Sequence, residues 1–425
     1  MQPVWRVETN LPGGDGLVRV DGEVVLVRGA VEGDRLRLQL GARQRGVRRG
    51  RIVELVEASP MRVTPPCPVA DRCGGCALQA VAIEAQAAMK SRWVRDAFGS
   101  LMDAGSKWLP MVSADAPRLR RRLRWFVGHD AAGYFLGFYA AGTHQPVRHG
   151  HCAVVEPALN QLRAWLEAAF DLQGVQSVQA LLLDDGAHLV IEGDDAPPQL
   201  ATRPDCVDGA VNIFWRDRAG VTRPLRQAAQ QSVHQPMQSL HDRLPAGSRE
   251  IALLVGPDDF VQGQREGNRE LIAQIQAWAG DVRRVADLFC GIGNLSLPLA
   301  VATGAEVAGA ELNGASVRAA MRSAGVLGVQ AAFVQANLFE SFDMAPYVGA
   351  DLLILDPPRR GAKRIAASMG RLLPAKVVLI SCDVAAGARD GAALQRQGYR
   401  LAALRALDLF PFAGHVEAMS LWERA

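Results

Sequence analysis

Hydrophobic and polar side chains alternate over residues 1–60 with the period of two that is typical of half-buried β-strands. The clearest run is 35–40, in which three leucines alternate with Arg and Gln. The pair Asp21-Gly22 favours a tight turn between two shorter apolar runs, and this predicts a hairpin. We therefore expect a small all-β barrel over 1–60. Its predicted strands cover 17–20, 24–27, 35–40 and 52–56.

The pattern between residues 61 and 265 is mixed. Three prolines in 61–68 indicate a boundary after the barrel. A helix is predicted over 80–98, where Ala, Gln, Glu and Lys accompany periodic apolar residues. The segments 118–136 and 175–191 have strand-like patterns bounded by Gly, Asp and Pro. These patterns predict a mixed α+β central domain over 61–265.

From about Val282 onward, apolar runs alternate with segments of helical pattern. Such alternation is typical of βαβ units, in which helices cover both faces of a mostly parallel sheet. Residues 266–425 are therefore expected to form a doubly wound, Rossmann-like α/β domain. Its predicted strands are 285–288, 306–310, 332–335, 351–355, 377–380 and 401–404.

Composition narrows the class of protein. The 425 residues are 49% hydrophobic and 21% charged, which is enough apolar material for several cores and too little charge for a disordered chain. No apolar run is long enough to predict a membrane span, and the N-terminal residues lack the pattern of a signal peptide. We expect a cytoplasmic monomer without membrane contact. The net charge of +3 is too small to indicate nucleic-acid binding, so only local clustering can.

Several of the seven cysteines have a spacing that suits metal binding. Thiolates that lie close together on a Gly-rich segment are soft ligands for an iron–sulfur cluster. Structural zinc is the alternative, with His149 or His151 in place of one thiolate. The spacing alone leaves both open. The cysteines concerned are Cys67, Cys73, Cys76 and, far downstream, Cys152.

The segment DLFCGIGN, residues 287–294, follows the first predicted strand of the C-terminal domain. Its glycines allow the backbone to approach a ligand, and Glu311 at the end of the next strand can accept hydrogen bonds from ribose hydroxyls. The segment lacks the full G-x-G-x-x-G pattern, which disfavours nicotinamide cofactors. It is similar to the S-adenosylmethionine site of class I methyltransferases.

Three later positions carry candidate reactive groups. Asp356 begins the segment DPPRRG at the carboxyl end of a strand, where open α/β sheets bind ligands. Arg359 stands where amino-group methyltransferases have an aromatic residue, and this disfavours nitrogen methylation. Cys382 follows the next strand, and we expect a helix N-terminus to lower the pKa of its thiol, as suits a nucleophile; a buried structural thiol is the alternative. Glu417 has no packing reason to lie in the last apolar strand and is a candidate base.

With these residues in view, the chain resembles the bacterial RNA (uracil-5-)-methyltransferase family. The likeness is greatest to the 23S ribosomal RNA enzymes that carry an N-terminal TRAM domain and an iron–sulfur cluster. It covers nearly the whole chain, and its motifs follow the family's order. These motifs are CPVADRCGGC, DDFVQ, DLFCGIGN, DPPRRG, ISC with the downstream ARD, and GHVE.

The resemblance implies an OB-like TRAM barrel, a 4Fe-4S cluster on the four cysteines named above, and S-adenosyl-L-methionine as methyl donor. It implies that Cys382 is the nucleophile and Glu417 the base. It matches no site to Cys206 or Cys290, which we expect to be structural. The positions that it matches to the S-adenosylmethionine site are Gln262, Phe289, Asn294, Glu311, Asn337 and Asp356, and Asp356 could also face the target base.

The implied reaction is methylation of uridine C5, most consistent with 23S rRNA as substrate. A thiolate from Cys382 would add at C6, C5 would take the methyl group, and Glu417 would remove the C5 proton. The chain departs from the family's S-C-N-P at Asp383-Val384, and from its Val-Asn at Gly263-Gln264. The alternatives are a transfer-RNA uridine C5 methyltransferase and a catalytically inactive RNA-binding module.

Two clusters of arginine could hold an RNA backbone while the target base is flipped out. The first lies between the last two barrel strands without an intervening acid, and the second lies beside Trp125 and Phe126. Alternatively, these arginines are solvent-exposed side chains of loops and strand faces. The first cluster contains Arg43, Arg45, Arg48, Arg49 and Arg51, and the second contains Arg118, Arg120, Arg121, Arg122 and Arg124.

Overall fold

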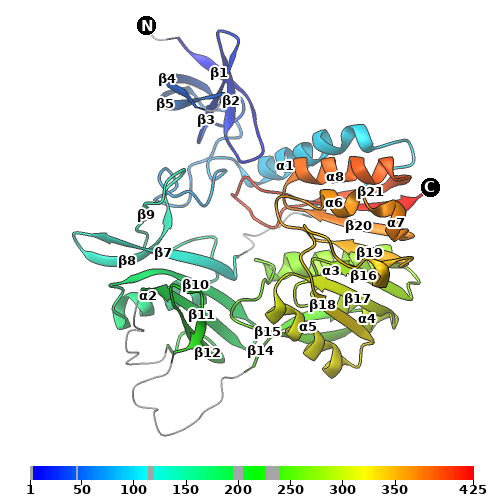
Figure 1. The fold of residues 1–425 in the computed structure, drawn as a ribbon. Helices are drawn as coiled ribbons and strands as arrows, with labels where there is room; N and C mark the ends of the chain where they lie inside the picture. Colours follow the sequence, from blue (N-terminus) through cyan, green and yellow to red (C-terminus); the bar gives the residue numbers. More distant parts are fainter. Residues whose placement is uncertain (1–2, 45, 113–118, 195–203, 226–238) are drawn as a thin grey trace.

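The computed structural model of the chain describes residues 3–44, 46–112, 119–194, 204–225 and 239–425. Over these ranges the chain forms three lobes, which Figure 1 shows as a barrel at the top, a seven-stranded sheet at the lower left and an eight-stranded sheet with its helices on the right. No helix within these ranges is long and apolar enough to cross a membrane.

The N-terminal lobe is a closed barrel with the strand order β1-β2-β3-β5-β4. Alternate residues such as Val18, Val25 and Leu36 point into its core, as the period of two predicts. Asp21 and Gly22 adopt φ values of 48° and 81°, and their left-handed turn joins β2 to β3. The expected all-β barrel is confirmed. Its strands are β1 (Trp5–Asn10), β2 (Gly16–Val20), β3 (Glu23–Val27), β4 (Arg35–Gln44) and β5 (Val47–Glu57).

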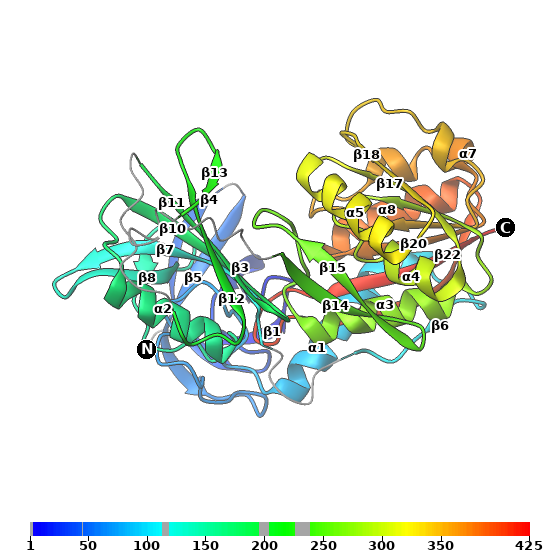
Figure 2. The same cartoon turned by 90° about the horizontal axis from the view of Figure 1, so that it is seen from below.

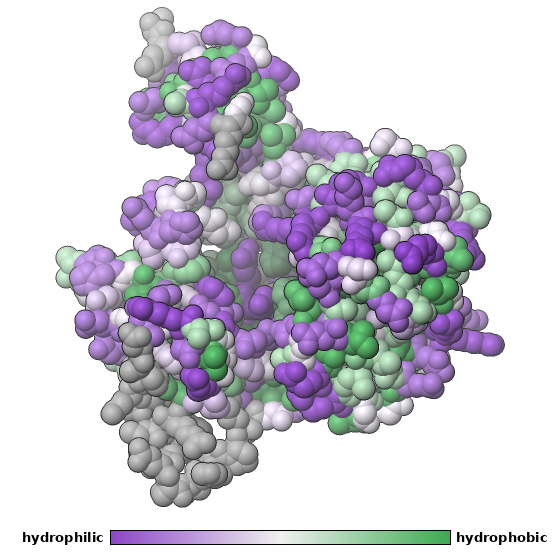
Figure 3. All heavy atoms as spheres, viewed as in Figure 1, coloured by the Kyte–Doolittle hydropathy of each residue, from purple (hydrophilic) through white to green (hydrophobic). Residues whose placement is uncertain are grey.

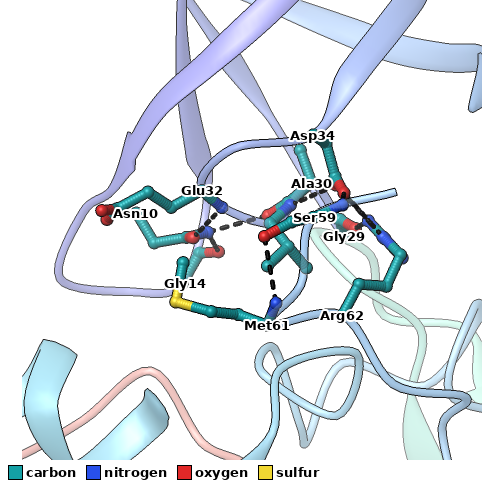
Figure 4. A network of polar contacts seen from close by, with 10 residues as sticks. Asn10, Gly14, Gly29, Ala30, Glu32, Asp34, Ser59, Met61 and Arg62 are labelled. Carbon is teal, nitrogen blue, oxygen red and sulfur yellow. Dashed lines mark hydrogen bonds and ion pairs between the residues drawn. The ribbon is translucent and has the colours of Figure 1, made fainter. Parts of the chain in front are cut away.

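A network of polar contacts around Asp34 ties the barrel to the segment that follows it (Figure 4). The buried Asp34 carboxylate accepts hydrogen bonds from the backbone amides of Val31 and Ser59, at 2.7 and 2.9 Å. It also forms an ion pair of 2.6 Å with Arg62. Asn10 donates to two loop carbonyls at the same end of the barrel. The direction in which the chain leaves the barrel is therefore fixed by buried polar contacts.

The second lobe is a seven-stranded sheet with the order β13-β12-β11-β10-β7-β8-β9. Its core combines Trp125 and Val178 of the sheet with Leu159, Leu162 and Leu166 of helix α2. This is the expected mixed α+β region. Its elements are β7 (Arg122–Asp130), β8 (Gly133–Tyr139), β9 (Pro146–Val147), α2 (Pro157–Ala169), β10 (Val175–Leu183), β11 (Gly186–Gly193), β12 (Ala210–Arg216) and β13 (Thr222–Pro224).

The third lobe is an eight-stranded sheet with the order β18-β17-β16-β19-β20-β22-β21-β6, in which β22 is antiparallel to both of its neighbours. Successive residues of β19 alternate between two cores: Leu352 and Ile354 join one, Leu353 and Leu355 the other. The expected doubly wound α/β domain is confirmed. Its strands are β16 (Arg284–Leu288), β17 (Glu306–Glu311), β18 (Ala331–Gln335), β19 (Leu352–Leu355), β20 (Lys376–Ser381), β21 (Tyr399–Leu407) and β22 (Glu417–Arg424).

Helices cover both faces of this sheet. On one face lie α3 (Arg265–Ala279), α4 (Ser296–Thr303) and α5 (Gly314–Leu327). The other face carries α1 (Ile83–Phe98), α6 (Lys363–Ala366), α7 (Met369–Leu372) and α8 (Val384–Arg396). Within the described ranges the chain also forms two short 3-10 helices, Gly99–Leu101 and Ala345–Tyr347.

Two segments from the range expected for the central domain pack against this third lobe. Helix α1 lies against α8, and β6 (Lys107–Trp108) pairs in parallel with β21 at the sheet edge. The hairpin of β14 (Leu240–Ala246) and β15 (Arg249–Val255) packs on α4 and α5, and Figure 2 shows it between the two larger sheets. The third lobe is thus completed by residues far apart in the sequence.

Candidate active site

The segment 287–294 forms a tight loop over the end of β17. Its backbone has positive φ values at Phe289 (69°), Gly291 (55°) and Gly293 (79°). The two glycines adopt this left-handed conformation without strain. The amides of Phe289 and Cys290 both donate to the carbonyl of Ala310, at 3.0 and 3.1 Å. This pairing fixes the loop above the carboxyl ends of β16 and β17, where doubly wound sheets bind ligands.

The Glu311 carboxylate is held at this loop through both of its oxygens. The amide of Gly291 donates to Oε2 at 3.2 Å, and the amide of Asn313 donates to Oε1 at 2.8 Å. Asn337 follows the neighbouring strand β18, and its Oδ1 accepts from the amide of Phe339 at 3.1 Å. The structure therefore places three predicted cofactor residues, Phe289, Glu311 and Asn337, after the adjacent strands β16, β17 and β18.

Asn294 ends the loop in a reciprocal pair with Asn268 of α3. Each side-chain amide donates to the carbonyl of the other at 2.8 Å. Asn268 is completely buried, and the sequence analysis missed it. An available signal was an asparagine among the periodic apolar residues of this segment, because a buried polar side chain requires a partner.

Asp287 at the start of the loop was also missed as a site residue. It is buried, and its Oδ2 accepts from the Ser296 hydroxyl at 2.6 Å. Burial raises the pKa of Asp287 to about 7, and Asp356 and Glu311 add to the rise. Its Oδ1 has no hydrogen-bond partner among the described residues. A buried acceptor without a partner fits a ligand that brings a donor, such as an ammonium group.

Gln262 and Asp356 are in direct contact. Gln262 Nε2 donates to Asp356 Oδ2 at 3.2 Å, and burial raises the pKa of this Asp to about 7. Arg121 Nε donates in turn to the Gln262 carbonyl at 3.1 Å, while its guanidinium pairs with the buried Asp242. The predicted residues Gln262 and Asp356 therefore lie side by side, and Arg121 is a buried support for Gln262.

Cys382 and Glu417 face each other across two paired strands. Ser381 of β20 pairs with Ala418 of β22, so the same antiparallel register brings Cys382 opposite Glu417. Glu417 is only 8% exposed. Burial raises the pKa of Glu417 to about 8, Asp356 adds to the rise, and Arg359 opposes it. The two candidate reactive groups thus meet at the carboxyl edge of the sheet, beside Asp356.

The thiol of Cys382 does not have the lowered pKa that its place before a helix predicts. Burial raises its pKa to about 11, and the carboxylates of Glu417 and Asp356 act in the same direction. Partial burial and two nearby acids therefore outweigh the helix N-terminus. The expectation of a lowered pKa was wrong because the acids come from strands distant in the sequence.

The departure at Asp383-Val384 leaves the start of α8 well formed. Asp383 is the N-cap of this helix, and its side chain accepts from the amide of Ala386 at 2.8 Å. Asp and Asn are comparable N-caps, and Pro at the first helical position is favoured without being required. Asp383-Val384 can thus serve in place of the family's Asn-Pro.

Residues 408–416, which we call the 408–416 loop, lead directly into Glu417 and are anchored by distant segments. Gly13 of the barrel donates its amide to the Gly414 carbonyl at 2.8 Å, and Leu78 donates its amide to the Phe412 carbonyl at 2.7 Å. Lys90 of α1 forms a buried ion pair of 2.7 Å with Asp408. The approach to Glu417 is therefore held by the barrel, by the segment after Cys76 and by α1.

His415 in this loop pairs with Arg359, with 3.0 Å between His415 Nε2 and Arg359 Nη2. Burial lowers the pKa of His415 to about 4, and Arg359 and Arg120 act in the same direction. The ring is therefore neutral at physiological pH and can accept a hydrogen bond from the guanidinium. The motif GHVE contains this residue, but the sequence analysis assigned it no role.

The four cysteines expected to bind a metal centre are brought near one another. Burial raises the pKa of Cys152 to about 11, and the thiols of Cys76, Cys73 and Cys67 add to the rise. Among the described residues, however, no group of three or more His, Cys, Asp or Glu side chains has the geometry to hold a metal ion. His149, the alternative zinc ligand, is buried against Phe138. The metal centre therefore stays a prediction.

The arginines of the two clusters have different surroundings in the structure: some form ion pairs with acids, and others line a cavity or contact an aromatic ring. Arg43 and Arg48 pair with Glu23, and Arg49 pairs with Asp15, so acids on neighbouring strands supply the charge that the local sequence lacks. In the second cluster the guanidinium of Arg120 lies 5.1 Å from the Phe410 ring, whereas Arg122 and Arg124 line a cavity. Arg51 contacts Gln39, and Arg45 and Arg118 lie outside the described residues.

The strand order, the glycine-containing loop after β16 and the acid after β17 define a class I methyltransferase domain. A family model described as "Methyltransferase small domain" matches residues 263–376. Curated proteins named 23S rRNA (uracil(1939)-C(5))-methyltransferase RlmD align over nearly the whole chain. The protein of Edwardsiella ictaluri is 34% identical over 431 residues, and that of Shewanella sp. strain MR-4 is 31% identical over 427 residues; each alignment covers 97% of this chain and 93% of the relative. The chain belongs to this family of RNA (uracil-C5)-methyltransferases.

A solved structure shares the overall fold. The tRNA (uracil-54, C5)-methyltransferase of Pyrococcus abyssi, in complex with S-adenosyl-L-homocysteine, matches with a TM-score of 0.73 at 20% identity. The match covers 98% of this chain and 100% of that chain. The family resemblance drawn from the motifs is thus confirmed by the relatives, and the fold by this structure.

Proposed function

We propose that this protein uses S-adenosyl-L-methionine to methylate C5 of a uridine in 23S rRNA, through a covalent adduct of Cys382 with Glu417 as base. The observation that carries the proposal is the strand register that brings Cys382 opposite Glu417 beside Asp356. The named function of the relatives supports the choice of substrate. The presence of both a thiol and a base argues against an inactive RNA-binding module.

The cofactor would lie against the 287–294 loop. Glu311 would accept hydrogen bonds from its ribose, and the unpartnered Oδ1 of Asp287 and the loop pinned by Asn294 fit a ligand that bears an ammonium group. The cluster of acidic side chains formed by Asp287, Glu311 and Asp356 also suits the positively charged sulfonium group of this cofactor. S-adenosylmethionine supplies an electrophilic methyl group, which uracil C5 cannot accept without activation.

The reaction balances with the residues at this edge of the sheet. The Cys382 thiolate adds to C6, and the electron pair of the C5–C6 double bond moves toward O4 as an enolate. C5 then takes the methyl group and keeps its proton. The Glu417 carboxylate removes that proton, the electron pair re-forms the double bond, and the Cys382 thiolate leaves. The target base must be flipped out of its stem to reach these groups.

Trapping of the adduct tests the mechanism. RNA substituted with 5-fluorouridine has no C5 proton to remove, so a stable protein–RNA complex should accumulate with the wild type and be absent from Cys382→Ala. Cys206→Ala is the matched control, since Cys206 lies outside all motifs, and it should trap RNA normally. Trapping by Cys382→Ala would refute the role of this thiol. Comparison of 23S rRNA and tRNA transcripts decides between the two substrates.

We further propose that Cys67, Cys73, Cys76 and Cys152 hold a 4Fe-4S cluster. Each thiolate of such a cluster binds a different iron, so the four sulfurs stand farther apart than the ligands of a single ion. The support for this proposal is that the four thiols lie close enough to interact electrostatically with one another. The cluster would crosslink the segment before Leu78 to the seven-stranded sheet and supply no step of methyl transfer. Iron and sulfide analysis of anaerobically purified protein, against Cys152→Ser, tests it; stoichiometric zinc without iron would refute it.

A further inference from the structure

A cavity of about 230 Å³ lies beside the candidate active site, between the seven-stranded sheet and the segment that leads to Gln262. Arg122 and Arg124 of β7 and His188 of β11 line it from the sheet, and Asp259 lines it from the opposite side. Figure 3 shows the molecule hollowed between the lobe that carries β7 and the methyltransferase lobe. The cavity thus borders the region in which an RNA substrate would lie.

No acid pairs with Arg122 among the described residues, whereas Arg121 pairs with Asp242 and Arg124 lies 3.5 Å from Glu192. Burial is the main cause that lowers the pKa of Arg122, and the neighbouring Arg124 lowers it further. Its guanidinium lies 4.9 Å from the centre of the Phe260 ring. A partly buried cation of this kind is favourable only where an anion or an aromatic face compensates its lost hydration.

The acids around the cavity are already engaged. Glu192 lies 3.5 Å from Arg124 but also pairs with Arg216 and accepts from Ser177. Asp259 accepts from the Gly256 amide at 2.7 Å and from the Ser316 hydroxyl at 2.5 Å. Their charges are therefore largely satisfied by other donors, whereas the charge of Arg122 is open to a ligand.

Phe260 adds an aromatic surface at the rim. It is 54% exposed, so its ring is accessible to a ligand. Phe260 precedes Gln262 by two residues, and Arg121, next to Arg122, donates a hydrogen bond to the Gln262 carbonyl. The cavity and the Asp356 site are therefore joined by the same two short segments of backbone.

We propose that this cavity is a nucleotide subsite of the RNA substrate, in which Arg122 binds a phosphodiester adjacent to the flipped uridine and Phe260 stacks on a neighbouring base. Arginine forms strong charge-assisted hydrogen bonds to phosphate, and aromatic rings bind unstacked bases with little regard to sequence. The inference rests on the proposed function for the nature of the ligand. In this proposal β7 of the seven-stranded sheet helps to position the RNA, although it lies outside the lobe that carries Cys382 and Glu417.

The test uses the full chain and an RNA fragment that contains the methylated site. Arg122→Met keeps the apolar stem over Phe260 and removes the charge, so it should raise the Kd for RNA about tenfold and reduce the slope of log K against log salt by about one. The Kd for S-adenosylhomocysteine and kcat at saturating RNA should stay within about twofold. Arg122→Lys keeps the charge but not the planar guanidinium, so it should restore the salt slope but only part of the affinity. Arg400→Met, which removes a paired arginine of β21, is the matched control and should change neither quantity.

Phe260→Leu separates the two contacts. It should weaken RNA binding but leave the salt slope unchanged, because it removes stacking without removing charge. Inorganic phosphate should compete with RNA for the wild type more strongly than for Arg122→Met. An unchanged Kd and salt slope in Arg122→Met, or an equal loss in Arg400→Met, would overturn the proposal. If the wild type binds RNA with the expected salt dependence but transfers no methyl group, the proposed function fails while this subsite stands.

Discussion

Cys382 lies opposite Glu417 across strands β20 and β22, and burial together with the Glu417 carboxylate raises the pKa of its thiol to about 11. Glu417 itself has a pKa of about 8. In the proposed mechanism both groups act in their deprotonated forms, so activity should be lost as pH falls below these values and gained as pH rises through them. We expect kcat/KM for RNA to increase with pH through about 8 and to keep rising above it. A profile that falls over that range would contradict the assignment.

The mutual effect of the two groups can be measured without RNA. Replacement of Glu417 by Gln removes a negative charge that disfavours the thiolate, so Cys382 should react with iodoacetamide at lower pH in E417Q than in the wild type. The rate of alkylation of Cys382, followed by peptide mass spectrometry over a pH series, gives the midpoint. An unchanged midpoint would mean that the two side chains are not electrostatically coupled.

Asp383 should be replaceable by Asn but not by Ala. Loss of its hydrogen bond to the Ala386 amide costs about 1 kcal/mol in the free energy of unfolding, whereas Asn keeps a good N-cap. Because Cys382 directly precedes the cap, D383A should also lower kcat. Urea unfolding and single-turnover methylation of both variants check this. Equal stability of D383A and D383N would show that the cap does not stabilise α8.

The buried pair of Lys90 and Asp408 should be costly to break from either side. Lys90→Met leaves an uncompensated buried carboxylate, and Asp408→Asn leaves a buried ammonium whose pKa burial already lowers. Each change should cost about 3–5 kcal/mol, and the double variant K90M/D408L should cost less than either. Thermal and urea unfolding measure the coupling. Strictly additive effects would contradict a direct interaction.

Asn268 should affect the cofactor and not the RNA. Asn268→Ala removes the reciprocal hydrogen bonds to Asn294 and frees the end of the 287–294 loop. We expect the Kd for S-adenosylhomocysteine to rise roughly tenfold, equivalent to about 1.4 kcal/mol. Isothermal titration gives this value, and filter binding of RNA serves as the internal control. If Asn268→Ala lost affinity for RNA and kept its affinity for S-adenosylhomocysteine, Asn268 would support RNA binding and not cofactor binding.

Sequence pattern could predict the turns and strands that are determined by a few consecutive residues. The turn at Asp21-Gly22 needs left-handed backbone, and the apolar run that contains β19 is buried on both faces of a central strand. Both features are visible in a few consecutive residues. Motif spacing likewise pointed to Glu311, Asp356, Cys382 and Glu417, and each lies at or next to the end of a strand of the third lobe, where doubly wound sheets bind ligands.

What could not be predicted depends on partners distant in the chain. The neutralisation of Arg48 by Glu23 comes from strand pairing. The raised pKa of Cys382 comes from its burial and from the acids Glu417 and Asp356, which other segments bring close to it. The pairing of β6 with β21 joins Lys107 to Ala403, across most of the length of the chain. Asn268 belongs to no motif and is defined only by the side chain that faces it. Each of these follows from topology, which a local pattern does not contain.

The contacts of the 408–416 loop make the position of Glu417, the proposed base, depend on segments that are distant in the sequence. A Cβ at position 414 would overlap the Gly13 backbone, so the barrel sits in van der Waals contact with the residues that precede Glu417. The Gly13 amide also donates to the Gly414 carbonyl at 2.8 Å, so the residues between β1 and β2 directly contact the residues that lead into β22. Glu417 is therefore positioned by the N-terminal barrel as well as by the strands of its own sheet.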